Sequence, residues 1–291
     1  MVVRAAAQPA ELRALQTLLW DELEGLGLGL RRDDISTWGS FPDSPPAQAS
    51  VGLFVGLGLG QSRLMWTARA LPGVRRPFEL IWATSELITS MDAITAMRPI
   101  SHDPSWRTAN GWFHCDQSGA KPGRHAVQGQ LLLEDQGPAS GGFAILPRSH
   151  RVFEETMGRI PGGDGPDDFV PIPAGDPLLE SCPPTLLCVP AGDMILWDSR
   201  LAHCSTSALS DAPVGVGSTA TGLQRATCQI CMTPRAWASE AVLRQRREAV
   251  ETGSTGSHWP HGYGQIPHPV RLLHPRADPS ALAAGRTTIF G

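Results

Sequence analysis

The sequence contains Val127-Gln128-Gly129-Gln130-Leu131-Leu132-Leu133-Glu134, a short apolar run with turn-forming residues on both sides. Similar short runs, separated by Gly and Pro, follow at residues 142–147, 186–190, 194–197 and 226–232. Short strands at regular spacing with turn signals between them predict a β-sandwich or β-barrel. We therefore expect a β core between about residues 91 and 233.

Helical patterns flank this core on both sides. Pro9 precedes leucines at helical spacing, and a helix is predicted there. Two more helices are expected, from about Gln61 and over residues 77–88, and a charged helix over residues 240–251. No linker divides the chain, so one domain is predicted over residues 1–291.

That domain has four expected parts. Residues 1–90 form a helical N-terminal flank, residues 91–233 the β core, and residues 234–291 a helix and a coil tail. Residues 158–184 are rich in Pro, Gly and Asp and are expected to form an insertion or lid, because long loops in compact domains are usually functional. The predicted fold class is mainly β with flanking helices.

Composition restricts the class of partner. The chain has 291 residues, 24 basic and 28 acidic, so its net charge of -4 gives no sign of a nucleic acid partner. Its longest apolar stretch, residues 51–60, is shorter than the roughly 20 residues of a membrane helix. Six cysteines without a secretory signal predict reduced thiols in a cytoplasmic protein. A small-molecule substrate is the expected partner, and the oligomeric state stays open.

His114, Asp116 and His203 are the candidate metal ligands. On a strand, residues two apart share a face, so His114 and Asp116 can present an imidazole and a carboxylate to one point. His203 follows the predicted strand 194–197 and supplies a third ligand. Two His and one carboxylate form the facial triad that binds Fe(II). A tetrahedral zinc site with the same residues is the main alternative, and an isolated surface pair is the simplest one.

Arg225 is the candidate anchor for a dicarboxylate cosubstrate. A guanidinium can hold a carboxylate through two parallel hydrogen bonds, which a lysine cannot do. Arg225 opens the predicted strand 225–230, and Thr227 and Gln229 share its face. The alternative is a surface charge at a strand end.

Several ordered motifs together resemble a known family, the phytanoyl-CoA dioxygenase-type oxygenases that depend on Fe(II) and 2-oxoglutarate. The resemblance covers roughly residues 78–262. It runs through Trp112-Phe113-His114-Cys115-Asp116-Gln117, Val127-Gln128-Gly129-Gln130-Leu131, residues 141–150, residues 192–200, His203 and Arg225.

The resemblance implies a double-stranded β-helix, or cupin-like jelly roll, in which His114, Asp116 and His203 hold Fe(II). It also implies that 2-oxoglutarate and O2 are cosubstrates, that the far carboxylate of 2-oxoglutarate meets Arg225, and that a C–H bond of the substrate is oxidised. Because Arg225 follows His203 at a longer distance than is usual in the family, residues 205–222 are expected to contain an inserted loop. The presence of Asp116 favours hydroxylation over halogenation.

Other residues are expected around this centre. Thr227, Gln130 and Trp197 are candidates for cosubstrate binding, and Gln117, Arg98 and Arg200 for substrate binding. Alternatively, Trp197 only packs in the hydrophobic core. Arg98 and Arg200 alternatively form structural salt bridges with Asp193 or Asp198. A structural role is expected for His150, Cys228 and Cys231, and solvated loop positions are expected for His258, His261, His268 and His274. A zinc-containing or noncatalytic cupin-like protein that binds a small molecule is the alternative function.

Overall fold

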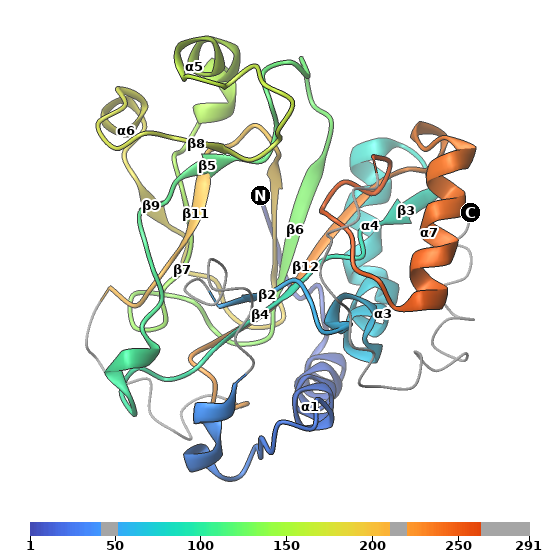
Figure 1. The fold of residues 1–291 in the computed structure, drawn as a ribbon, viewed down its shortest axis with the longest axis vertical. Coiled ribbons are helices and arrows are strands. Elements are labelled where there is room, and N and C mark those ends of the chain that lie inside the picture. Colours follow the sequence, from blue (N-terminus) through green and yellow to red (C-terminus); the bar gives the residue numbers. More distant parts are fainter. Residues whose placement is uncertain (42–51, 210–219, 263–291) are drawn as a thin grey trace.

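The computed structural model describes residues 1–41, 52–209 and 220–262. Its centre is a pair of antiparallel sheets (Figure 1). The larger sheet contains, in order, β1 (Val2–Val3), β10 (Met194–Asp198), β6 (Val127–Leu132), β12 (Arg225–Pro234), β4 (Ile94–Met97) and β2 (Leu53–Phe54), and β3 (Leu87–Thr89) also pairs with β12. The smaller sheet contains β8 (Val170–Pro171), β5 (His114–Cys115), β11 (His203–Thr206), β7 (Gly142–Ile145) and β9 (Thr185–Leu186).

The chain crosses repeatedly between the two sheets. Strands β4, β6, β10 and β12 lie in the larger sheet, whereas β5, β7, β9 and β11 lie in the smaller one. This alternation of antiparallel strands is the double-stranded β-helix, or jelly roll, that the sequence resemblance implied. The predicted fold class is confirmed.

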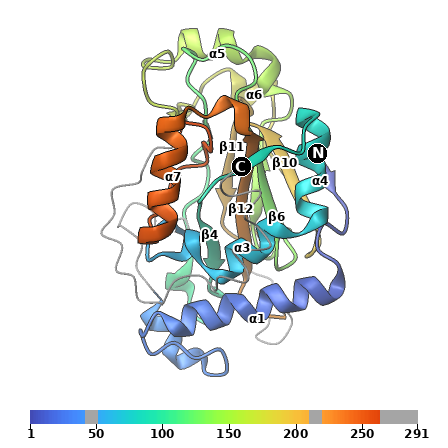
Figure 2. The ribbon, with the colours of Figure 1, turned by 90° about the vertical axis from the view of Figure 1, so that its right-hand side faces the viewer.

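Helices cover the outer face of the larger sheet (Figure 2). These are α1 (Pro9–Gly25), α3 (Arg63–Ala70) and α4 (Pro72–Trp82), with α7 (Glu240–Thr252) beside them. On β12 the residues alternate: Ala226, Cys228 and Ile230 belong to the apolar cluster that includes the helices' leucines. Arg225, Thr227 and Gln229 therefore point the other way, into the space between the sheets. This alternation separates an apolar packing face from a polar interior.

The N-terminal flank differs from its prediction in two ways. The helix expected over residues 77–88 is α4, which begins at Pro72 and ends where Ala83 adopts a left-handed conformation, with φ of 51°. Pro72 occupies the first turn, where its missing N–H costs nothing, and Pro77 lies inside the helix. The flank is also not purely helical, since β1, β2 and β3 all extend the larger sheet.

The segment 158–184 is more ordered than a simple insertion. It begins at the end of α5 (Phe153–Arg159) and contains β8 and α6 (Leu178–Ser181). Because β8 pairs with β5, this segment extends the smaller sheet beside His114.

Part of the expected loop 205–222 and the tail beyond residue 262 lie outside the described residues. The short 3-10 helices are Ile35–Ser40, Leu59–Gln61, Pro104–Trp106, Ser149–Val152 and Arg235–Trp237.

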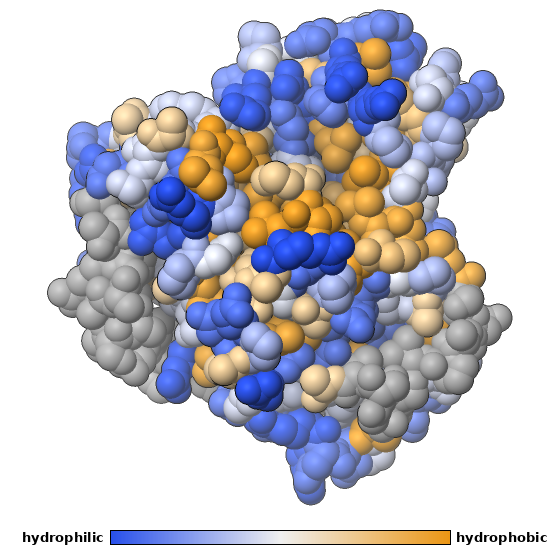
Figure 3. Space-filling model, turned by 180° about the vertical axis from the view of Figure 1, so that it is seen from behind, coloured by the Kyte–Doolittle hydropathy of each residue, from blue (hydrophilic) through white to orange (hydrophobic). Residues whose placement is uncertain are grey.

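Within the described ranges, no helix has both the length and the apolar character needed to cross a membrane. Apolar side chains gather near the middle of one face of the molecule, between hydrophilic regions above and below (Figure 3).

Candidate metal centre

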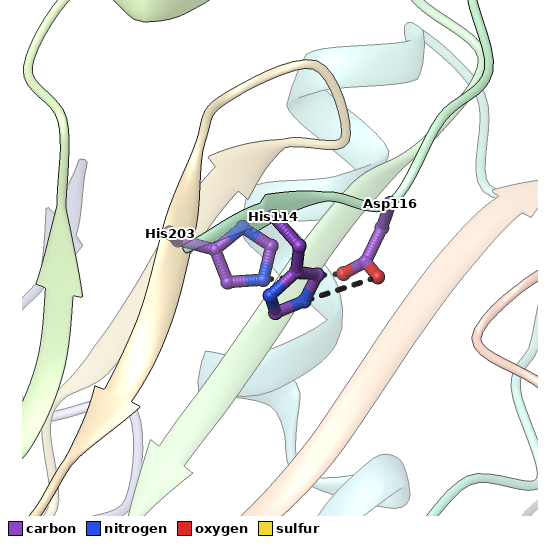
Figure 4. A group of neighbouring side chains, drawn as sticks. All are labelled: His114, Asp116 and His203. Carbon is purple, nitrogen blue, oxygen red and sulfur yellow. Dashed lines mark ion pairs between the residues drawn. The ribbon is translucent and has the colours of Figure 1, made fainter. Parts of the chain in front are cut away.

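Pairing of β5 with β11 creates the centre. His114 lies directly opposite His203 in this ladder, and Asp116 follows β5 immediately. The Nε2 atom of His114 lies 3.4 Å from Oδ1 of Asp116, and Nε2 of His203 lies 3.1 Å from Oδ2 (Figure 4). The ligand atoms of all three side chains lie within 4.8 Å of one another. Residues far apart in sequence thus form one compact N,N,O donor set.

Backbone carbonyl groups orient both imidazoles. Nδ1 of His114 lies 3.3 Å from the Trp112 carbonyl oxygen, and Nδ1 of His203 lies 2.8 Å from that of Leu201. A carbonyl oxygen only accepts, so each Nδ1 carries the proton and each Nε2 keeps its lone pair. This tautomer is the one that ligates a metal through Nε2.

Asp116 is held as a carboxylate. Gln128 on β6 donates from Nε2 to its Oδ2 at 2.9 Å, and the Asp116 N–H donates to the Ser199 carbonyl oxygen. Burial alone would raise the pKa of Asp116, but the positive charge of His258 and the contacts with the two histidine ligands hold it well below its ordinary value. The ionised form is the one that binds a cation.

Aromatic rings surround the two imidazoles. Trp112 stacks on His114 with 5.0 Å between ring centroids, and the Phe169 ring lies 4.5 Å from the same imidazole. Phe143 and Trp197 lie 5.1 Å and 5.2 Å from His203. Burial lowers the pKa of His114, against the opposing charge of Asp116, so the neutral imidazole is favoured.

Arg225 is a buried cation on the inner face of the larger sheet. Its side chain is 1% exposed, and Nη1 donates to Ser205 Oγ at 2.6 Å across the space between the sheets. Nε is buried without a hydrogen-bond partner, and in the described part of the chain no carboxylate pairs with this guanidinium. Burial lowers the pKa of Arg225 to about 10. A buried charge without a counter-ion is costly, so the site is suited to an anionic ligand.

The other residues expected at the cosubstrate site share this inner face. Gln130 lies opposite Gln229, and Thr227 lies two residues from each of Arg225 and Gln229 on β12. Trp197, on β10, lies opposite Gln128 of β6 and beside His203. Both Gln130 Oε1 and Trp197 Nε1 are buried without a partner among the described residues. Together with Arg225 Nε, these atoms are free to bind a polar ligand.

Gln117, which the sequence analysis expects to bind substrate, is hydrogen-bonded to neighbouring protein groups. Its side chain is fully buried, its Nε2 donates to the carbonyl oxygens of Lys121 and Gly123, and its Oε1 accepts from Ser199 Oγ. With all of these groups engaged, Gln117 braces the loop that follows β5.

The two arginines expected to bind substrate are held by other partners. Arg98 donates to the Trp38 carbonyl oxygen at 3.0 Å, and its guanidinium lies 4.6 Å from the Trp106 ring centroid. Arg200 forms a two-bond ion pair with Asp198, which was the alternative expected for it. These contacts engage both guanidinium groups within the protein, and the substrate role expected for the two residues stays a prediction.

Several contributing residues were not identified from sequence. Nothing in the local sequence identifies Gln128 as the partner of Asp116, or Ser205 and Phe169 as neighbours of the site. His258 was expected in a solvated loop but is half-buried, with Nε2 3.4 Å from the Asp116 carbonyl oxygen. His261 contacts Thr233, and His150 lies in the 3-10 helix Ser149–Val152 that follows β7. Cys228 and Cys231 are buried free thiols.

Comparisons with known proteins agree with this site. The phytanoyl-CoA dioxygenase family model matches residues 92–213. The chain is 27% identical over 279 residues to Ava biosynthesis cluster protein O of Aspergillus versicolor, across 92% of this chain and 85% of the relative.

Two solved structures match this chain over 80% of its length. One is the epimerase SnoN in complex with Fe3+, alpha-ketoglutarate and nogalamycin RO, with 15% identity, a TM-score of 0.48, and coverage of 80% of this chain and 78% of that chain. The other is EctD from S. alaskensis with 2-oxoglutarate and 5-hydroxyectoine, with 17% identity, a TM-score of 0.49, and coverage of 80% and 70%. The stretch that the phytanoyl-CoA dioxygenase family model matches, residues 92–213, contains all three candidate metal ligands, His114, Asp116 and His203.

Proposed function

We propose that this protein is a dioxygenase that uses Fe(II), 2-oxoglutarate and O2 to oxidise a C–H bond of a small metabolite or natural product, most simply by hydroxylation. His114, Asp116 and His203 are the proposed iron ligands. Arg225 is the proposed anchor of 2-oxoglutarate, with Thr227, Gln130 and Trp197 around it. The zinc or noncatalytic alternative explains the three ligands, but it does not explain the buried Arg225 cation, which has no carboxylate partner in the described ranges.

The observation that carries the proposal is the buried Arg225 guanidinium. Among the described residues, its one side-chain hydrogen bond goes to Ser205, on the strand that begins with His203. His203 and Ser205 share a face and are separated by about 6.7 Å along the strand. A five-carbon dicarboxylate has a comparable length, so one carboxylate can reach the metal ligands while the other meets Arg225.

The protein's own groups have defined tasks in this proposal. Bound iron supplies the oxidising chemistry, in which 2-oxoglutarate is decarboxylated to succinate and CO2 while the substrate C–H bond is oxidised. The two backbone carbonyls fix the imidazole tautomers, and Gln128 fixes the Asp116 carboxylate. Trp197 and Phe143 pack beside His203 and exclude water from that side.

We also propose that the whole chain forms one functional unit. Residues 1–291 form a single oxygenase domain, with residues 1–90 as N-terminal flank, 91–233 as core and 234–291 as C-terminal part, and it acts in the cytoplasm. The similarity to a relative named as a biosynthesis cluster protein supports a small natural product as substrate.

The test is an anaerobic titration of metal-free protein with Fe(II) and then 2-oxoglutarate, monitored by the visible absorption band of their chelate. Wild type is expected to develop the band, and Arg225→Met is expected to require much more 2-oxoglutarate. Arg200→Met is the matched control, because Arg200 is paired with Asp198. Tightly held zinc with no band and no succinate production would refute the proposal.

A further inference from the structure

Phe169 is an exposed apolar side chain beside a proposed metal ligand. It is 55% exposed, yet its ring centroid lies only 4.5 Å from that of the His114 imidazole. A single exposed phenylalanine is ordinary on a protein surface. Phe169 differs because several contacts hold its backbone beside the metal ligands.

The backbone on both sides of Phe169 is tied to the segment that carries His114. On one side, Val170 and Pro171 pair with Cys115 and His114, and the Ile172 N–H donates to the Phe113 carbonyl oxygen at 2.8 Å. These bonds hold the ring in register with the ligand strand.

On the other side, the Asp168 carboxylate makes two contacts. It accepts from the Ser118 N–H at 3.1 Å, and it forms an ion pair with Lys121, the only lysine of the chain. Because Ser118 and Lys121 lie in the loop after Asp116, these contacts fix the position of Phe169 relative to that ligand.

Charge near this ring is negative. Residues 158–184 contain five acidic residues and one basic residue, giving this segment a net charge of -4. Asp168 and Asp176 are paired, with Lys121 and Arg159, whereas Asp164 and Asp167 are exposed. An anionic substrate would be repelled at this edge, whereas a neutral or cationic one would not.

We infer that Phe169 contacts the substrate and sets its specificity, and that the substrate presents an apolar ring on a neutral or cationic molecule. The Lys121–Asp168 pair is a positioning device for this ring. The inference rests on the proposed function, because the substrate must lie beside the metal.

The test uses phenethylamine as the probe, with hexylamine as the ringless comparison and phenylacetate as the anionic one. Saturation-transfer NMR on the metal-free protein measures contact with the probe ring. Protein loaded with Mn(II) and 2-oxoglutarate then measures paramagnetic relaxation of the probe protons, which places the contact beside the ligands.

Wild type is expected to relax the phenethylamine ring more strongly than either comparison compound. Loss of an aromatic contact in Phe169→Ala should weaken probe binding about fivefold. Phe169→Trp should retain it. Leu80→Ala is the control, because Leu80 is 65% exposed on α4, on the outer side of the larger sheet.

Lys121→Met should weaken the probe contact without changing Mn(II) affinity, and Lys121→Arg should restore it. If Lys121 had a merely structural role, its replacement would change both the probe contact and the Mn(II) affinity, or neither of them. Equal relaxation in wild type and Phe169→Ala, or preference for phenylacetate, would overturn the inference. Failure of Mn(II) or 2-oxoglutarate to bind would refute the proposed function alone, because the metal-free measurement reads the ring contact independently.

Discussion

Gln128 donates a hydrogen bond from its side-chain nitrogen to Oδ2 of Asp116 at 2.9 Å. The same carboxylate oxygen faces Nε2 of His203, so Gln128 restricts how the carboxylate can rotate. Groups that orient metal ligands in this way commonly contribute 10- to 100-fold to metal affinity or activity.

We therefore expect Gln128→Leu to weaken Mn(II) binding by about tenfold or more. Mn(II) titration monitored by electron paramagnetic resonance measures this effect directly. Gln130→Leu, two residues along the same face, should leave affinity for Mn(II) alone unchanged. Unaltered affinity in Gln128→Leu would show that Asp116 needs no such support.

Replacement of Asp116 tests the donor set itself. Asp116→Ala removes the only carboxylate among the three ligands, leaving two imidazoles that cannot neutralise the metal charge. Iron-dependent succinate production should fall to background, and metal retained after desalting should fall with it. Normal succinate production by this variant would exclude the proposed centre.

Arg225 should have opposite effects on stability and on binding. Because its buried charge has no carboxylate partner among the described residues, Arg225→Met is expected to stabilise the ligand-free protein by about 1 kcal/mol. Urea unfolding measures this change. In wild type, 2-oxoglutarate at about 100 times its Kd should add about 2.7 kcal/mol to stability.

The Arg225→Met variant should lack that added stability, whereas Arg200→Met should keep it. Equal stabilisation of all three proteins by 2-oxoglutarate would place the cosubstrate elsewhere.

The lowered pKa of His261 predicts that the protein loses stability in mild acid. Burial, with smaller contributions from His125 and Lys121, lowers the pKa of His261 to about 4. The unfolded chain, with an ordinary histidine pKa near 6.5, therefore binds more protons than the folded protein between pH 6.5 and 4. The contribution of His261 is complete above that window and is lost as pH falls through it.

Urea midpoints across this pH range should fall less steeply in His261→Gln than in wild type. His102→Gln is the control, because His102 is exposed. Identical slopes in His261→Gln and wild type would assign the acid sensitivity to other groups.

Local sequence carried much of the fold and the ligand set. Alternation on β12 separates Arg225, Thr227 and Gln229 from Ala226, Cys228 and Ile230, and this period of two is a property of any strand. The pair His114 and Asp116 is likewise visible as a spacing, and the ordered motifs around it identified the jelly roll. Helix ends were harder to predict from sequence. The sequence predicted that one helix begins at Pro77, whereas α4 begins at Pro72.

Contacts between distant segments were decided only by the tertiary structure. Sequence spacing cannot show that Gln117 donates to a backbone carbonyl of its own loop while Gln128, on another strand, donates to Asp116. Nor can it show that Ser205 reaches Arg225 or that Phe169 lies over His114. The sequence by itself determined which residues alternate and which chemistry they offer. Tertiary structure decided which of them meet, because strand register and sheet-to-sheet packing are set by the whole core rather than by neighbours along the chain.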